Sequence, residues 1–270
     1  MMKRFMRGAW FLPTALILGL AFLYGPILSV IIYSFNESQL VTVWSGFSTK
    51  WYAALLDDGQ VLHAAGLSLE VALASATGAL VVGTLAGYVL ARFKQFHGRT
   101  LFSGMVLAPL VMPEIIMGIS MLLLFVGMQD AVGWPVGRGI ETIIIAHITF
   151  TTAFVAVIIQ SRLADTDLSV EEAAMDLGAR PIQVFFLVTL PLMAPALIAG
   201  WLLAFSISLD DLVTTSFVSG PGSTTLPLVI FSKVRLGLNP EINALATVVI
   251  ALVSIVTFLA AIYQSRRSVQ

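Results

Sequence analysis

Three acidic residues lie inside strongly apolar segments and are the side chains there best suited to chemistry. Glu114 follows the run Ala108-Pro109-Leu110-Val111-Met112-Pro113, and Asp210 and Asp211 follow Ser208-Leu209. An Asp at the centre of a membrane helix costs about 2.5–3.5 kcal/mol on the insertion scale. Acids at such positions therefore mark substrate or ion pathways by default. We predict that Glu114, Asp210 and Asp211 line a pathway through the protein.

The charge of this predicted pathway favours cations. The apolar segments contain no matching series of Lys or Arg, which disfavours an anionic substrate. Residue types alone leave metal ions, protons and organic amines open. A simpler alternative for Asp210 and Asp211 is solvation near the end of their helix. However, Asp210 is about 15 residues beyond Pro195, or roughly 22 Å at 1.5 Å per residue, which places it past the bilayer centre but below the surface.

The sequence around Glu114 also predicts an irregular helix. Pro109 and Pro113 both fall inside the apolar segment that carries this acid. Proline lacks a backbone N–H and interrupts helical hydrogen bonding. We therefore predict a kink or hinge at Pro109 and Pro113.

Enzyme chemistry has no support in the sequence. There are no cysteines, and the three histidines lie too far apart to form a spaced ligand pair. We predict no catalytic residues, no metal site and no cofactor bound by this chain. For His147 and Gln160, and for the nearby Thr149, Thr151 and Thr152, we predict hydrogen bonds between helices.

Composition indicates an all-α integral membrane protein. Of the 270 residues, 58% are hydrophobic and only 11% are charged. A membrane-spanning helix needs about 20 mainly apolar residues. Six segments meet this requirement and predict one transmembrane domain over residues 1–270: Trp10–Phe35, Leu67–Ala91, Leu101–Met128, Ile140–Gln160, Pro195–Val218 and Ile242–Tyr263. The net charge of −1 gives no case for nucleic-acid binding.

Basic residues predict the orientation of these spans. With a cytoplasmic N-terminus, ten Lys and Arg residues fall on the cytoplasmic side and four on the other, namely Lys50, Arg138, Lys233 and Arg235. Basic residues are enriched on the cytoplasmic side of membrane proteins. We therefore predict that both termini are cytoplasmic, as is the loop of about residues 161–191.

That loop reads as two short helices joined by a tight turn. Ser169 followed by Glu172 is the pattern of a capping box at a helix N-terminus. Gly178 suits the position after a helix C-terminus. A second apolar helix is predicted from Ile182 to Leu190, before Pro191.

This loop resembles the EAA loop of ABC importer permeases. The resemblance rests on Glu172-Ala173-Ala174, Gly178, Val188 and Leu190-Pro191 at the family's spacing. The family usually has Ile where Val188 stands. The resemblance implies a type I importer permease fold. It also implies that the helix containing Glu172, Ala173 and Ala174 fits a cleft on a separate ATPase, with Gly178 making the turn.

Further motifs narrow the resemblance to polyamine importer permeases, and most closely to second permease subunits of putrescine importers. They are Tyr33-Ser34-Phe35-Asn36, Trp51-Tyr52, Ala108 to Glu114, Ser208 to Asp211, Phe217 to Gly222 with Leu226-Pro227, and Asn239 to Ala244. Polyamines are cations, which agrees with the acids identified above. Trp51 and Tyr52 by themselves suit either a membrane-interface anchor or a contact for an external partner.

The resemblance implies an assembly in the bacterial inner membrane. Its other members would be a homologous permease that forms a heterodimer with this chain, two copies of a cytoplasmic ABC ATPase, and a periplasmic polyamine-binding protein. ATP and Mg²⁺ would be used by the ATPase. In agreement, Gly220-Pro221-Gly222 is not followed by the Gly-Lys-Ser/Thr of a phosphate-binding loop. The alternative is a secondary cation transporter or channel that uses the same acids without an ATPase.

Overall fold

The computed structural model describes residues 2–40, 43–93, 95–237 and 240–267. Within these ranges the chain is helical, and its extended pairing is an isolated antiparallel bridge between Asn36 and Phe47. The fold divides into two compact units, Met1–Leu62 with Ile230–Gln270, and His63–Val229. Two residues used in the sequence predictions lie outside the described residues. They are Lys94, one of the ten basic residues assigned to the cytoplasmic side, and Asn239, the first residue of the last motif.

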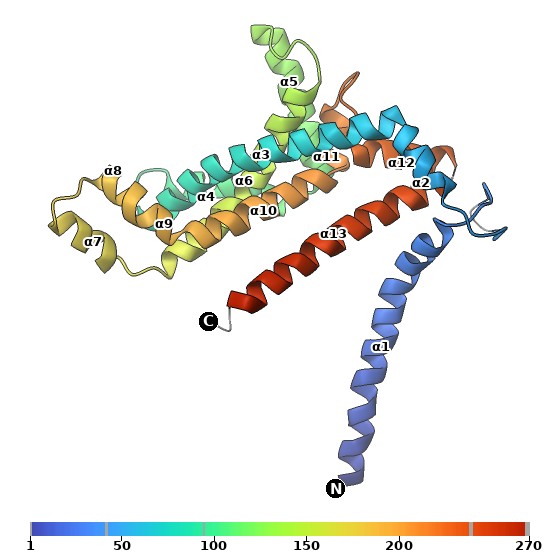
Figure 1. Cartoon of the computed structure of the whole chain (residues 1–270). Helices are drawn as coiled ribbons and strands as arrows, with labels where there is room; N and C mark the ends of the chain where they lie inside the picture. The colour runs from blue at the N-terminus through green and yellow to red at the C-terminus, as the bar shows by residue number, and fades with distance from the viewer. Residues whose placement is uncertain (1, 41–42, 94, 238–239, 268–270) are drawn as a thin grey trace. The chain divides into compact units, whose positions relative to one another are not determined.

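The larger unit is built on three helices that run side by side: α3 (Gly59–Arg92), α6 (Ile140–Ala164) and α10 (Ala194–Asp210) (Figure 1). Their packed faces are apolar and largely small, which lets the helices approach closely. The core between them contains Ala76, Ala79, Val155, Ile159, Leu163, Met193, Ala196 and Ala204.

Glycines allow α3 to approach α6. A Cβ atom added to Gly87 would lie 2.6 Å from the Ala156 carbonyl oxygen, and one added to Gly83 would lie 2.7 Å from the Val155 Cβ. Real Cβ atoms do not come this close to backbone, so a side chain here would force the helices apart. Gly66, on the same helix, has open space around its Cβ position.

We expect Gly87→Ala to destabilise the protein by about 1–3 kcal/mol, the usual cost of overpacking a core. Gly66→Ala is the matched control and should be neutral or stabilising by about 0.5–1 kcal/mol, because alanine favours a helix interior. The measurement is the thermal unfolding of both variants in detergent. Equal midpoints for the two variants would show that the close approach of α3 to α6 is not required.

Two of the predicted spans are broken in the structure. The segment predicted as a continuous span over 101–128 forms α4 (Arg99–Val111) and α5 (Glu114–Val132). The segment predicted over 195–218 forms α10 and α11 (Val213–Val218), separated at Asp211-Leu212. The break at Met112-Pro113 agrees with the kink or hinge predicted at Pro113. The break at Asp211-Leu212 was not predicted, so the prediction of a continuous helix over 195–218 was wrong.

Local backbone chemistry explains the first break. Met112 is extended, with ψ 135°, because a residue before proline is driven away from the helical region. Pro113 then precedes the first residue of α5. Pro109 lies inside α4 without ending it.

Among the residues that the structure describes, four helices are long and apolar enough to cross a membrane, at Phe11–Tyr33, Gly59–Arg92, Glu114–Val132 and Ile140–Ala164. A fifth candidate is the pair Pro181–Leu192 and Ala194–Asp210, bent by 71°. The apolar part of α13 (Pro240–Arg267) over Pro240–Ile255 is shorter. The exact count of six spans and the cytoplasmic termini remain predictions.

In the smaller unit, the loop after α1 (Met2–Tyr33) is organised around Asn36. This side chain is buried and its amide donates to the Val43 carbonyl at 2.7 Å. The Trp51 indole, on α2 (Lys50–Asp57), donates to the Asn36 carbonyl at 2.7 Å and is only 9% exposed. Trp51 thus stabilises its own unit, which fits neither role suggested for it by the sequence.

An ion-pair cluster connects other parts of the smaller unit. Lys233, on α12 (Leu226–Leu236), lies 2.5 Å from an Asp58 oxygen and 3.0 Å from Glu241. The hydrogen bond from Lys233 lowers the pKa of Asp58 even though partial burial opposes this shift. Asp58 also accepts from the Gln60 N–H at 2.9 Å, at the start of α3.

The sign of this shift predicts a pH dependence. Because the folded-state pKa of Asp58 lies below its unfolded value of about 3.9, its stabilisation is present above that value and is lost as the pH falls through the lowered pKa. Asp58→Asn keeps a good capping residue and removes the charge. We expect the stability difference between the parent and this variant to shrink on acidification. Asp57→Asn, at an exposed neighbour, is the control for unfolding curves in detergent.

Candidate functional site

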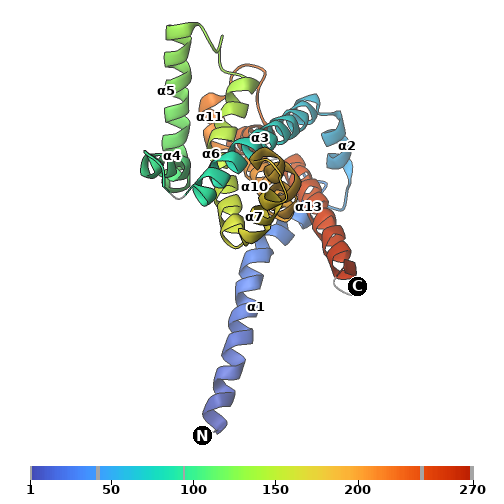
Figure 2. The ribbon, with the colours of Figure 1, turned by 90° about the vertical axis from the view of Figure 1, so that its left-hand side faces the viewer.

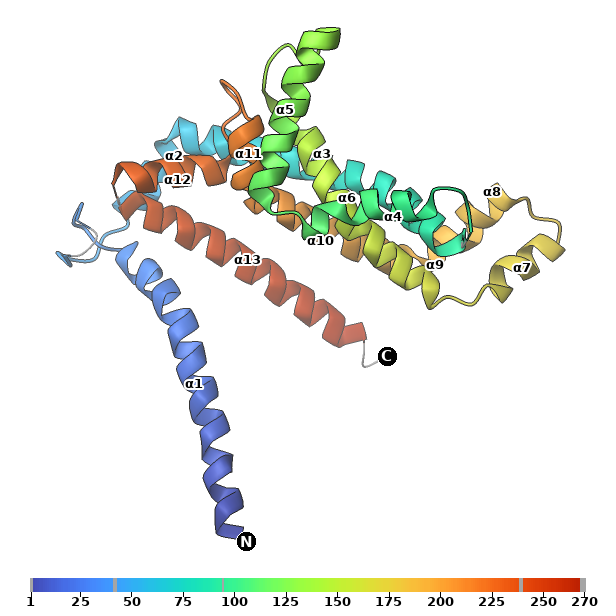
Figure 3. The ribbon, with the colours of Figure 1, turned by 180° about the vertical axis from the view of Figure 1, so that it is seen from behind.

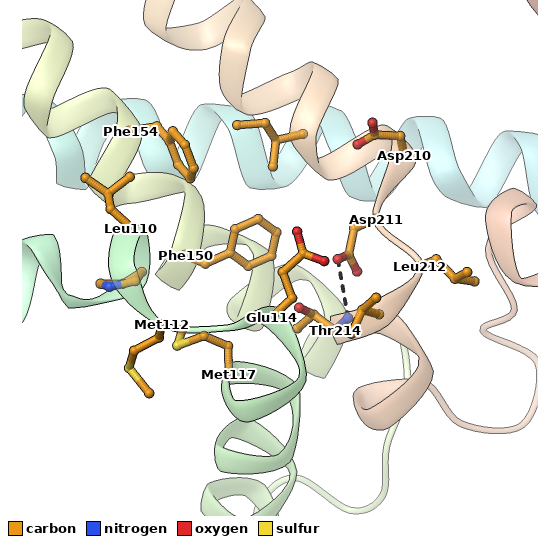
Figure 4. Close-up of a pocket in the computed structure, with 13 residues that line it drawn as sticks. Leu110, Met112, Glu114, Met117, Phe150, Phe154, Asp210, Asp211, Leu212 and Thr214 are labelled. Atoms are coloured by element: carbon orange, nitrogen blue, oxygen red, sulfur yellow. Dashed lines mark hydrogen bonds between the residues drawn. The ribbon is translucent and has the colours of Figure 1, made fainter.

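The two helix breaks of the larger unit meet at a cavity of about 400 Å³. Glu114 is the first residue of α5, Asp210 is the last residue of α10, and Asp211 follows in the second break. All three line the cavity (Figure 4). The structure thus brings together the three acids that the sequence singled out, although their role in a pathway remains a prediction.

The rest of the cavity wall is mainly apolar. It includes Phe150 and Phe154 from α6, and Ile207 from α10, and the other lining side chains are Pro109, Leu110, Met112, Met117, Leu212, Val213 and Thr214. Aromatic faces attract cations and also cover aliphatic groups. The arrangement therefore suits a cation that carries an apolar chain.

Asp211 is held by the start of α11. Its Oδ2 accepts from the Thr215 backbone N–H at 2.7 Å and from the Thr215 hydroxyl at 2.7 Å. Its Oδ1 accepts from the Thr214 N–H at 3.3 Å, the bond drawn in Figure 4. A carboxylate here satisfies otherwise unpaired N–H groups at a helix N-terminus. These hydrogen bonds explain why the chain turns at Asp211. They also fix the position of the Asp211 carboxylate.

A buried histidine completes this arrangement from a third helix. His147 on α6 is 0% exposed, and its Nδ1 lies 2.7 Å from the Ser208 hydroxyl oxygen. Its Nε2 lies 2.9 Å from the Thr215 hydroxyl oxygen and 3.3 Å from Asp211 Oδ2. Since the Thr215 hydroxyl donates to Asp211, it must accept from the N–H at Nε2. His147 thus joins α10 to α11 across their break.

The predicted interhelical role is confirmed for His147 but was wrong for Thr149, Thr151 and Thr152. Within the described residues the buried Thr152 hydroxyl has no hydrogen-bond partner. Thr149 and Thr151 donate to carbonyls of their own helix. The partnership of His147 with Asp211 was missed by the sequence analysis. The two residues are separated by a long stretch of chain, and no spacing rule connects them.

Glu114 and Asp210 differ from Asp211. Both are exposed, and no hydrogen bond or ion pair to another residue holds either carboxylate within the described ranges. Figure 4 places them on different helices around the cavity, with Glu114 reaching from α5 towards the α10–α11 break. They are therefore the acids available to a ligand.

The loop of about residues 161–191 forms the helical elbow that the sequence predicts. α7 (Ser169–Asp176) ends at Gly178, which has φ +92°. The N–H groups of Gly178 and Ala179 donate to the carbonyls of Met175 and Ala174 at 2.9 and 3.1 Å. This is a Schellman arrangement, in which glycine is favoured because of its positive φ. The stop predicted at Gly178 is confirmed.

The start of α7 differs from the prediction. Ser169 is the first helical residue, and its side chain makes no capping hydrogen bond. Instead, Asp167 accepts from the Ser169 N–H at 3.0 Å. The predicted capping box of Ser169 and Glu172 was therefore wrong, because an acid two residues earlier takes the position.

The second half of the elbow runs from Pro181 to Leu192 and contains a π-helical segment. Its parts are α8 (Pro181–Val184), η1 (Phe185–Thr189) and α9 (Leu190–Leu192). Leu190 packs against the core of the larger unit, Val188 is half-buried and Pro191 is exposed.

α7 lies at one end of the larger unit, while α11 lies at the other (Figures 2 and 3). The exposed surface of α7 combines acidic, small and apolar side chains. Glu172 and Ala173 are exposed and Ala174 is half-buried. Leu177, just after the helix, is 90% exposed. Small residues beside an exposed leucine permit the close approach of a partner surface.

The chain is similar in sequence to two bacterial transport permease proteins. The putrescine transport system permease protein PotI of Escherichia coli is 59% identical over 245 residues, which cover 91% of this chain and 87% of that protein. The spermidine/putrescine transport system permease protein PotC of Escherichia coli is 42% identical over 254 residues, 93% of this chain and 91% of that protein.

The fold has a solved counterpart. A crystal structure of a bacterial ABC transporter involved in the import of the acidic polysaccharide alginate contains a chain that matches with a TM-score of 0.70 and 17% identity, over 95% of each chain. This match confirms the predicted all-α fold, and the identities to PotI and PotC confirm the resemblance found in the sequence. The family model described as binding-protein-dependent transport system inner membrane component matches residues 83–269. The chain belongs to this family of inner membrane transport components.

Proposed function

We propose that this chain is one permease subunit of an ATP-driven importer of polyamines such as putrescine or spermidine. The observation that carries the proposal is the cavity at the two helix breaks, where Glu114 and Asp210 lie beside Phe150 and Phe154 and have no ion-pair partner among the described residues. The names of the relatives PotI and PotC support the same class of substrate.

The distribution of charge favours an organic amine over a metal ion. Among the described residues, no three acidic or histidine side chains converge as metal ligands. Glu114 and Asp210 instead come from separate helices. A linear amine with two ammonium groups can pair with both acids, while its methylene chain lies against the apolar wall.

The three acids divide into two roles in this proposal. Glu114 and Asp210 bind the cargo. Asp211 contributes negative charge to the cavity, but it chiefly holds the α10–α11 break through Thr215 and His147.

Transport would proceed by alternating access within one membrane domain of residues 1–270, with both termini cytoplasmic. Two copies of a cytoplasmic ABC ATPase would use ATP and Mg²⁺. One of them would dock on the 161–191 loop of this chain, where Glu172, Ala173, Ala174 and Gly178 form the contact. The movement of the docked loop would reach α10 through Val188, Leu190 and Pro191. The helices α4 and α5 would reorient at Pro109 and Pro113. A homologous permease completes the membrane dimer, and a periplasmic binding protein delivers the polyamine.

The direct test is reconstitution in proteoliposomes with the partner permease, the ATPase and the binding protein. We expect putrescine uptake that requires ATP and the binding protein. Uptake that persists without ATP and follows a proton gradient would overturn the proposal in favour of a secondary transporter.

A second test addresses docking. Leu177→Asp should weaken copurification of the ATPase about tenfold to a hundredfold, because burial of a leucine contributes roughly 1.5–3 kcal/mol. Val136→Asp is the matched control, since Val136 is 91% exposed in the loop between α5 and α6. Equal ATPase recovery with both variants would exclude Leu177 from the docking surface.

A further inference from the structure

The buried acid of the elbow is Glu171, the residue before the exposed Glu172. The whole of Glu171 is 6% exposed. Neighbouring residues on a helix point about 100° apart, so a pair of adjacent acids on α7 faces in two directions. Glu172 faces outward and Glu171 faces the permease itself.

Glu171 joins α7 to the end of α3. Its Oε1 lies 2.7 Å from Arg92 Nη2, and the side chains are 9% and 10% exposed. Arg92 Nη1 also donates to the Leu163 carbonyl at 3.0 Å, near the end of α6. Removal of one partner from a buried ion pair leaves an unpaired charge, which is strongly unfavourable. The three helix ends are therefore held together by one charged contact.

The same carboxylate oxygen also reaches the π-helical segment. The Thr189 hydroxyl donates to Glu171 Oε1 at 3.1 Å, and Thr189 is 1% exposed. Thr189 is the last residue of η1, which leads through α9 into α10. Single π-helical turns occur frequently at functional sites. At its other end, α10 carries Asp210 into the cavity.

We propose that Glu171 is the positioning residue that transmits motion of α7 to the membrane helices. Arg92 receives this motion for α3, and Thr189 receives it for the segment that continues into α10. The inference rests on the proposed docking of an ATPase on α7, but it concerns a separate step. Docking uses the outer face of α7, and transmission uses the inner face.

The test compares transport with ATP hydrolysis in the complete reconstituted complex. Glu171→Gln and Arg92→Gln should bind the ATPase as the parent does and still hydrolyse ATP. The number of ATP molecules hydrolysed per polyamine imported should rise about tenfold, as expected when a buried hydrogen bond to a charged group is lost. The double variant should be no worse than the worse single one, because both remove the same contact. Asp165→Asn, at an exposed acid of the loop, is the control.

Two variants of Thr189 that leave the ion pair intact keep the test decisive if the charge variants fail to fold. Thr189→Val preserves shape and removes the hydroxyl, whereas Thr189→Ser retains it. We expect the ratio of ATP hydrolysed to polyamine imported to rise about threefold or more in Thr189→Val and to be restored in Thr189→Ser.

Two results would overturn the inference. One is an unchanged ratio in assembled complexes of Glu171→Gln and Thr189→Val. The other is loss of ATPase copurification in these variants, which would make the cluster a support for the docking surface only. Failure of the proposed function itself is distinguishable, because the parent complex would then show no ATP-dependent uptake.

Discussion

Asp210→Asn and Glu114→Gln are each expected to reduce ATP-dependent polyamine uptake at least about tenfold, because hydrogen bonds to charged groups are each worth roughly 1.5–3 kcal/mol. Both amides preserve shape and remove the negative charge. Within the described residues neither carboxylate is engaged by another side chain, so the loss should appear in transport and hardly in stability. The double variant should transport less than either single one, since the two acids would hold different ammonium groups.

The measurement is radiolabelled putrescine uptake into proteoliposomes, with the thermal midpoint of each variant in parallel. Asp130→Asn is the matched control, because Asp130 is an exposed acid on α5 remote from the cavity lining. Parent rates in both single variants and in the double variant would show that these acids do not bind the cargo.

Replacement of His147 should impair stability and transport together. His147→Phe removes the hydrogen bonds that α6 makes to Ser208 and Thr215. The buried Ser208 hydroxyl then loses its partner, whereas the Thr215 hydroxyl keeps its bond to Asp211. The expected loss of stability is about 1–3 kcal/mol for each polar group that is left unpaired. Uptake should fall as well, because the α10–α11 break would no longer hold Asp210 and Asp211 in place.

A positioning role for His147 predicts a specific pattern among variants. His147→Gln retains an N–H donor and should recover part of the stability and of the uptake. The losses of stability caused by His147→Gln and by Asp211→Asn should not add in the double variant, because the two side chains belong to one hydrogen-bond network. His97→Gln, at an exposed histidine between α3 and α4, is the control for thermal unfolding and uptake. Additive effects would mean that His147 and Asp211 act independently.

The sequence alone determined the class of this protein and the identity of its most informative segments. Apolar composition indicated a helical membrane protein, and the isolated acids indicated which side chains inside the apolar segments could meet a cation. The glycine after α7 could be assigned because its positive φ is a local backbone requirement. The loop motif could be recognised because its spacing is contained in one short stretch of chain.

The tertiary structure alone decided which of these residues act together. Helix packing brings the break at Met112-Pro113 beside the break at Asp211-Leu212, and it pairs His147 with Asp211. It also buries Glu171 and exposes Glu172, although the two acids are neighbours of the same type. Hydropathy and spacing describe local chain properties, whereas these contacts depend on the rotation and separation of helices that are distant in sequence. For that reason the three acids could be found in the sequence, but the hydrogen bonding that holds Asp211 and sets it apart from Glu114 and Asp210 could not.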